Sequence, residues 1–201
     1  MNLEPDLNTK QNNSLRSNII EFLQSVIFAI LVCIIVYLFI ATPNQIEGES
    51  MYPTFENGEI VLTSKVHEWL GGTPFGKSID LEYKRQDVVV FQKPGLDDFI
   101  KRIIAKPGDT IQLKDGKVLV NGTILEEDYL IENAETLGGS FLIENQEAKT
   151  LGQDEYFLMG DNRNNSRDSR YLEVGLVKRE WLKGKVLIRY WPLSKLAIIN
   201  N

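Results

Sequence analysis

The hydrophobic residues of this chain form one long run near the N-terminus, followed by many short runs. Between Phe22 and Ile40 only a glutamine, a serine and an amphipathic tyrosine interrupt the apolar positions. Taken from Ile19, a helix over this run would be ~33 Å long at ~1.5 Å per residue, enough to cross a ~30 Å hydrocarbon core. The pattern therefore predicts a transmembrane helix over residues 19–41.

Two other interpretations of this run fit less well. A cleavable signal peptide would have an apolar region of only ~7–15 residues that ends at a small-x-small site. Here the run is longer and is followed by Ala41-Thr42-Pro43, so an uncleaved anchor is favoured. A buried core helix of a soluble protein is favoured least.

The flanking charges indicate the orientation of the anchor. Lys10 and Arg16 precede the run, whereas no lysine or arginine occurs from Ala41 to Ser64. Because basic residues are retained on the cytoplasmic side, we expect a single-pass protein of the cell membrane with a cytoplasmic N-terminus and an extracytoplasmic C-terminal part. Residues 1–18 are polar and Asn-rich and predict a disordered cytoplasmic tail.

Beyond the anchor, short β-branched and aromatic runs bounded by turn residues predict strands. These runs lie at 59–62, 87–91, 99–105, 111–120, 156–159 and 186–191. Within one of them, Asp115-Gly116 separates two apolar stretches and predicts a hairpin. Only 177–182 suggests a short helical turn. We therefore predict a mainly β, mostly antiparallel extracytoplasmic domain over residues 42–201, with an inserted smaller β subdomain over 108–155.

Composition narrows the class of protein further. The chain is 43% hydrophobic and 25% charged, as folded proteins are, and its net charge of -6 argues against nucleic-acid binding. The single cysteine, Cys33, lies in the apolar run, so no intramolecular disulfide can stabilise the exported domain. We expect no metal and no cofactor, and a monomeric chain.

Ser50 follows the apolar run by ten residues, in Gly48-Glu49-Ser50-Met51-Tyr52-Pro53-Thr54. A serine hydroxyl is a weak nucleophile until a base removes its proton. The one histidine, His67, lies in a connection with no catalytic setting around it, and we expect it to be an ordinary surface residue.

A lysine can replace histidine as the base if burial lowers its pKa from ~10.4 by a few units. Lys101 lies in an apolar strand, where alternation places it on the same face as Phe99 and directs Arg102 to the other face. On the local sequence alone, a solvent-exposed lysine on an edge strand fits this pattern better than a buried base.

The segment from Gly160 to Arg170 is dense in polar groups. Its eleven residues include two aspartates, three arginines and three asparagines. Such a segment forms either a solvated loop or a buried hydrogen-bond network, and charge alternation alone favours the loop.

In this order, the segments resemble the sequence boxes of bacterial type I signal peptidases, a family of serine proteases with a Ser/Lys dyad. The similarity covers residues 19–193, and the box at 160–170 is highly specific. It reverses the local interpretations of Lys101 and of the charged loop. The segments that carry it are Ser50–Thr54, Phe99–Arg102, Lys106–Asp109 and Gly160–Arg170, with weaker similarity at Asp87–Phe91 and Tyr190–Leu193.

The resemblance implies a fold of the signal-peptidase and repressor-protease type, and a role for each matching residue. Ser50 would attack the scissile carbonyl, and Lys101 would act as general base. The backbone N–H of Ser50 would help to bind the oxyanion. Many family members carry a serine two positions before the nucleophile, where this chain has Gly48, so a second oxyanion donor is not assigned. Ser166 would hydrogen-bond the amine of Lys101.

The resemblance also implies supporting and substrate-binding residues. Two ion pairs, Asp161 with Arg102 and Asp168 with Arg170, would support the site. The substrates would be signal-peptide-bearing preproteins, held in the same lipid bilayer and bound by strand addition. Shallow apolar pockets for the small residues one and three places before the cut would be lined by Ile46, Met51, Phe99, Ile100 and Leu158.

Two rival functions remain at this stage. A soluble Ser/Lys protease of the self-cleaving repressor type shares the dyad, but the anchor and the box at 160–170 count against it. A non-catalytic, membrane-anchored β binding module, such as an inactivated homologue, would need no paired nucleophile and base. Every expected catalytic position is filled here, which favours the enzyme.

Overall fold

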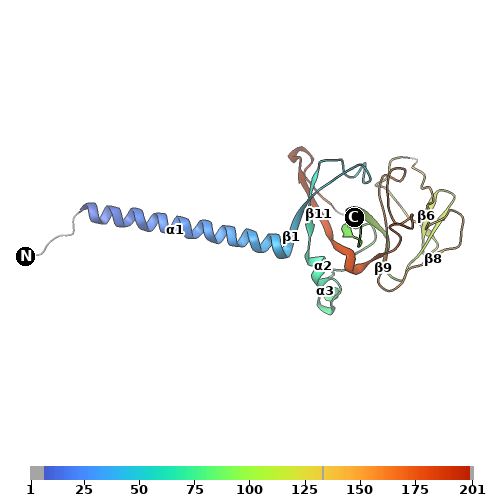
Figure 1. Ribbon diagram of the computed structural model, residues 1–201, viewed down its shortest axis with the longest axis horizontal. Helices are drawn as coiled ribbons and strands as arrows, with labels where there is room; N and C mark the ends of the chain where they lie inside the picture. The colour runs from blue at the N-terminus through green and yellow to red at the C-terminus, as the bar shows by residue number, and fades with distance from the viewer. Residues whose placement is uncertain (1–6, 133, 200–201) are drawn as a thin grey trace, which may run out of the picture. The chain divides into compact units, whose positions relative to one another are not determined.

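The computed structural model describes residues 7–132 and 134–199 (Figure 1). The chain divides into two compact units, residues 1–40 and residues 41–201. The first unit consists of helix α1 (Leu7–Ile35), which continues directly as a π-helical segment (Val36–Ile40). The second unit contains all the strands.

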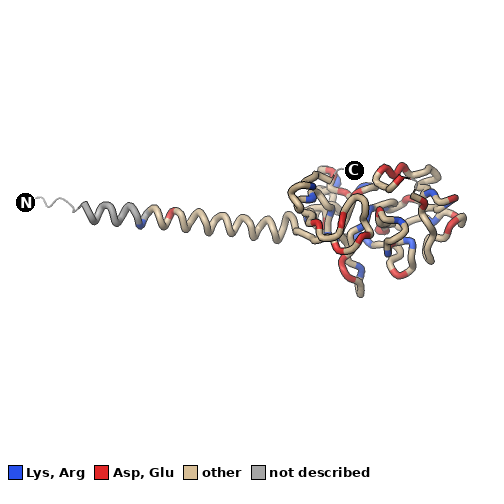
Figure 2. The backbone as a smooth tube through the Cα atoms, turned by 90° about the horizontal axis from the view of Figure 1, so that it is seen from above, with Lys and Arg blue, Asp and Glu red and all other residues tan. Residues whose placement is uncertain are grey.

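The helical unit has the length and composition of a membrane span. Asn18–Ile40 covers 23 residues, and an 18-residue window within it has a mean hydropathy of 2.8 and no buried residues. Figure 2 shows that this part of the tube is almost free of charged residues. One N-terminal helix long and apolar enough to cross a bilayer is therefore present.

The predicted disordered tail over residues 1–18 is wrong for its described part. Helix α1 already begins at Leu7, while residues 1–6 lie outside the described residues. The segment 7–18 contains no proline or glycine. Once the apolar segment has nucleated a helix, each further residue adds a hydrogen bond at little cost, so the helix extends toward the N-terminus.

The second unit is mainly antiparallel β structure, as predicted. Its large sheet has eight strands in the order β1-β2-β11-β3-β4-β9-β10, with β12 paired to β11. All pairings are antiparallel. The strands are β1 (Ala41–Gln45), β2 (Ile60–Ser64), β3 (Val88–Gln92), β4 (Asp98–Ala105), β9 (Glu155–Met159), β10 (Val177–Lys178), β11 (Leu182–Trp191) and β12 (Ala197–Ile198).

A second, four-stranded sheet lies within the segment predicted as an insertion. Its order is β7-β6-β5-β8, from β5 (Thr110–Lys114), β6 (Lys117–Val120), β7 (Thr123–Ile124) and β8 (Lys149–Thr150). Asp115 and Gly116 both have positive φ, as the tight turn of the predicted hairpin requires. Side chains of β5 and β6 share one buried cluster with β4 and β9, so the two sheets form a continuous core.

The loops contain short elements that pattern analysis captured only in part. A 3₁₀ turn at Arg179–Trp181 confirms the helical turn expected at 177–182, and another forms at Leu193–Lys195. Two single-turn helices, α2 (Val66–Leu70) and α3 (Pro74–Ser78), occupy the glycine-rich loop after β2. Its aromatic residues Trp69 and Phe75 are 56% and 61% exposed, so they are not part of the core.

Candidate active site

Ser50 lies in the loop between β1 and β2. The loop is anchored by Met51 and Phe55, which are almost completely buried in a cluster with residues of β2, β3 and β11. Hydrogen bonds from Tyr52 N to Glu49 O and from Phe55 N to Met51 O close its turns. The buried anchors therefore hold Ser50 at the rim of the core, next to the exposed Glu49.

Lys101 is buried beside Ser50. It lies on β4, between β3 and β9, so the edge-strand interpretation is wrong. Its side chain is on the same face as Phe99, with Nζ 5.4 Å from the ring centroid, and the residue is only 2% exposed. Nζ donates hydrogen bonds to Ser50 Oγ at 2.7 Å and to Ile100 O at 2.9 Å. The two residues, 51 positions apart in the sequence, are thus in direct contact.

Burial sets the electrostatics of this pair. Desolvation lowers the pKa of Lys101 from 10.5 to about 8, and the negative charges of Asp168 and Asp161 oppose part of this shift. A buried ammonium loses its hydration, and burial therefore favours the neutral amine. A neutral amine is the form that can accept a proton from a hydroxyl.

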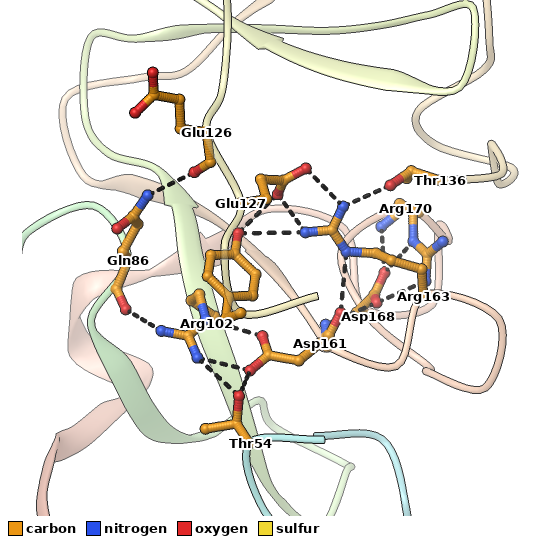
Figure 3. Close-up of polar contacts among 12 residues, drawn as sticks. Thr54, Gln86, Arg102, Glu126, Glu127, Thr136, Asp161, Arg163, Asp168 and Arg170 are labelled. Carbon is orange, nitrogen blue, oxygen red and sulfur yellow. Dashed lines mark hydrogen bonds and ion pairs between the residues drawn. The ribbon is translucent and has the colours of Figure 1, made fainter. Parts of the chain in front are cut away.

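Both ion pairs that the resemblance implied are present (Figure 3). Arg102 donates to both carboxylate oxygens of Asp161, at 2.9 and 2.6 Å. Arg170 donates to both oxygens of Asp168, at 2.9 Å each, and Asp168 also accepts the backbone N–H of Gly160. All four side chains are buried, so both ends of the segment 160–170 belong to an internal network, whereas Asn164, Asn165 and Arg167 in its middle are exposed.

Ser166 does not make the hydrogen bond to Lys101 that the resemblance implied. Its Oγ is buried but has no hydrogen-bond partner among the described residues. It lies against Gly160, where an added Cβ would come within 2.2 Å of it. The amine of Lys101 instead donates to Ser50 Oγ and to the carbonyl of Ile100, its neighbour on β4.

A cleft with a volume of about 790 Å³ contains Ser50 and Lys101. Four of the predicted pocket residues line it, namely Ile46, Met51, Phe99 and Ile100. The fifth, Leu158, is not among the residues that line this cleft. It is fully buried on β9, opposite Ile103, because that face of β9 packs into the core of the large sheet.

Gly48 lines this cleft with its backbone in a left-handed conformation. Its φ is +81°, and its N–H donates to Asn57 Oδ1 at 2.9 Å. The left-handed conformation favours glycine at this position. The Gly48 N–H is therefore engaged within the loop, which leaves the Ser50 N–H as the donor that the resemblance assigns.

Sequence reasoning missed several residues that brace the site. Thr54 donates to Asp161, and the backbone N–H of Asn162 donates to the Ser50 carbonyl. Arg163 is buried and pairs with Glu127, 36 residues earlier in the chain. Arg163 belongs to the recognised box, but no sequence pattern pointed to its partner.

The other candidate chemistries have no support from the geometry. His67 is half-buried; its Nδ1 lies 3.2 Å from Ser64 Oγ and its ring lies 5.8 Å from that of Tyr83. Neither neighbour lines the cleft, although the ring is more buried than the surface position expected. Across residues 7–132 and 134–199, no group of three or more His, Cys, Asp and Glu side chains could hold a metal ion.

Comparisons with known proteins identify relatives of this chain. The chain is 34% identical over 191 residues to signal peptidase IB of Staphylococcus aureus strain COL, a match that covers 90% of this chain and 94% of that protein. It is 30% identical over 193 residues to signal peptidase I S of Bacillus subtilis strain 168, covering 94% and 98%.

A crystal structure of a signal peptidase I from Enterococcus faecalis V583 is 28% identical, covers 52% of this chain and 96% of that one, and has a TM-score of 0.41. The family model described as signal peptidase, peptidase S26, matches residues 19–191. This chain therefore belongs to the signal peptidase family, peptidase S26.

Proposed function

We propose that this protein is a membrane-anchored serine endopeptidase that removes N-terminal signal peptides from exported preproteins at small-x-small sites. Ser50 is the nucleophile and Lys101 is the general base. The single observation that carries the proposal is the 2.7 Å hydrogen bond between Ser50 Oγ and the buried Nζ of Lys101.

In the first half of the reaction, neutral Lys101 accepts the proton of Ser50 Oγ as the oxygen attacks the scissile carbonyl carbon. The carbonyl oxygen becomes an oxyanion that the Ser50 backbone N–H binds. When the C–N bond breaks, Lys101 returns the proton to the leaving amine of the mature protein. The signal peptide is left as an ester on Ser50.

In the second half, Lys101 takes a proton from a water molecule that attacks this ester. The C–O bond to Ser50 breaks, Lys101 reprotonates Ser50 Oγ, and the signal peptide leaves with a new carboxyl group. The hydrogen bond from Asn162 N to the Ser50 carbonyl, at 3.0 Å, supports the role of Ser50 as nucleophile, because it fixes the peptide plane that follows this residue.

The cleft supports an extended substrate. β1 is at the end of the sheet order, and Asn44, Gln45 and Ile46 line the cleft, so the backbone of a substrate can pair along this edge. The apolar side chains of Met51 and Ile100 lie in the same cleft and suit small apolar residues before the cut.

The anchor supports a bilayer location. The excess of basic residues before the span favours a cytoplasmic N-terminus and an exported catalytic domain. A preprotein holds its own apolar segment in the same bilayer, so enzyme and cleavage site meet at the outer face.

The test is cleavage of a preprotein by the purified full-length protein, with the cut mapped by mass spectrometry. We expect a cut after a small-x-small sequence, and loss of cleavage in Ser50→Ala and in Lys101→Ala with the fold retained. Near-normal turnover in either variant would exclude the dyad. Absence of any cleavage by the unaltered protein would favour the non-catalytic binding module.

A further inference from the structure

Arg163 connects the inserted segment to the loop that carries the polar box. Its guanidinium donates to both carboxylate oxygens of Glu127, with Nη1 3.1 Å from Oε2, and to the Thr136 hydroxyl. On the other side, its Nε donates to the carbonyl of Gly160 at 3.2 Å. Figure 3 shows this guanidinium between Glu127 and Thr136. One buried cation thus joins the insertion to the start of the box.

Tyr129 adds a second connection from the same insertion. Its hydroxyl donates to Glu127 Oε1 at 2.7 Å, and its ring covers the guanidinium of Arg102, with Cζ 3.9 Å from the ring centroid. Burial raises the pKa of Tyr129, so its hydroxyl keeps the proton that it donates. Arg102 follows Lys101 in sequence and is the arginine that pairs with Asp161.

The box in turn holds the nucleophile loop. Asn162 donates its backbone N–H to the Ser50 carbonyl and its side-chain amide to the Glu49 carbonyl at 3.1 Å. Thr54 donates to Asp161 at 2.6 Å. The segment 160–163 therefore has the insertion on one side and the backbone of Ser50 on the other.

We propose that Glu127 and Tyr129 are positioning residues for the cleavage reaction. They hold Arg163 and Arg102 in place, and through these arginines they set the segment 160–163 against Ser50 and Lys101. They touch neither the substrate nor the reacting atoms. The inference rests on the proposed function, and it gives the inserted segment a part in the chemistry.

Substitutions at Glu127 and Tyr129 should lower the cleavage rate, because they would displace the residues held against Ser50 and Lys101. A displacement of ~1 Å at a reacting group can lower a rate by ~10²-fold. Glu127→Gln would leave Arg163 buried with a neutral partner. Arg163 would then be held less firmly, and its hydrogen bond to the Gly160 carbonyl would weaken. Tyr129→Phe would remove only the hydroxyl, whereas Tyr129→Leu would also remove the ring that covers Arg102.

The experiment measures kcat and KM for preprotein cleavage by full-length protein in detergent micelles. We expect kcat to fall by ~10- to 100-fold in Glu127→Gln and Tyr129→Leu, and less in Tyr129→Phe. KM should stay within ~2-fold, because the cleft residues are untouched.

The matched control is Arg85→Gln. Arg85, which precedes β3, also forms a two-bond pair with a carboxylate of the insertion, Asp109, at 2.8 and 2.6 Å. Among the described residues, this pair makes no hydrogen bond to the box. This variant should lower the midpoint of urea denaturation while leaving kcat close to that of the unaltered protein.

A double variant separates positioning from stability. Glu127→Leu combined with Arg163→Met replaces the buried ion pair by apolar side chains, a change that is often neutral for stability. We expect the denaturation midpoint of the double variant to lie above that of Glu127→Gln and near that of the unaltered protein. Its kcat should stay low, since the hydrogen bond from Arg163 to the Gly160 carbonyl is gone. Recovery of kcat together with stability would overturn the proposal, as would a Glu127→Gln variant with the kcat of the control.

Cleavage by the unaltered protein distinguishes the positioning role from the proposed function. If the unaltered protein cleaves, Ser50→Ala does not, and Glu127→Gln has normal kcat, only the positioning role is refuted. If the unaltered protein does not cleave, the proposed function itself is refuted.

Discussion

Burial of Lys101 should destabilise the folded protein at neutral pH, and Lys101→Met should relieve this cost. The pKa of the lysine falls from 10.5 in the unfolded chain to about 8 in the fold. At ~1.4 kcal/mol per pKa unit, this shift corresponds to about 3 kcal/mol of stability lost at pH 7. Methionine fills a similar volume without a charge, although it gives up hydrogen bonds worth ~1 kcal/mol each. We therefore expect a variant that cannot cleave yet is about 1–3 kcal/mol more stable at pH 7.

The sign of the pH dependence follows from proton linkage. Between pH 8 and 10.5 the unfolded chain binds more protons at this lysine than the folded protein does, so the free energy of unfolding of the unaltered protein rises with pH. Below pH 8 the full penalty applies. The advantage of the methionine variant should therefore be largest at pH 7 and should disappear as the pH approaches 10.5.

Urea denaturation of the full-length protein in micelles, followed by tryptophan fluorescence at pH 7, 8.5 and 10, measures this difference. Lys114→Met is the matched control, because Lys114 is an exposed lysine on β5. Its stability difference from the unaltered protein should not change with pH. If Lys101→Met showed an equally constant difference, the lysine would not be desolvated and the argument for a neutral base would fail.

Three further predictions concern the same site. The rate constant kcat/KM should rise about tenfold per pH unit below an apparent pKa of about 8 and level off above it, as titration of Lys101 requires; a pH–rate profile that is flat from pH 6 to 9 would contradict this. Gly160→Ala should cost ~1–3 kcal/mol and abolish cleavage, because its Cβ would come within 2.4 Å of the Ser50 carbonyl oxygen; thermal unfolding and the cleavage assay test this together. Ser166→Ala should not lower the free energy of unfolding, since its hydroxyl has no partner among the described residues; a loss above ~1 kcal/mol in urea denaturation would show a bond that this structure lacks.

Much of the fold follows from local pattern, but the strand edges and faces do not. Alternation located β3 and β4, and Asp115-Gly116 located the hairpin, because strand period and turn chemistry are local properties. β1 was missed, since Pro43 and three polar neighbours hide a strand that exists only through pairing with β2. The buried positions of β9 could not be divided between two faces, because β9 is buried on both sides and its sequence does not alternate.

The candidate site, too, was predictable from the sequence only in part. Local sequence favoured an exposed Lys101, and only the similarity of the box at 160–170 indicated a buried one. The two ion pairs followed from that similarity. The contact between Arg163 and Glu127 did not, because it joins an acidic loop to the box through tertiary packing alone.

The proline in β1 has a consequence for self-association. β1 is the end strand of the large sheet, and an end strand with free backbone groups is a template on which a second copy can pair. Pro43 has no N–H, so a ladder between two copies would lack a donor in the middle of the strand. The end strand of this sheet thus carries its own protection against aggregation, in a chain whose single cysteine allows no internal disulfide.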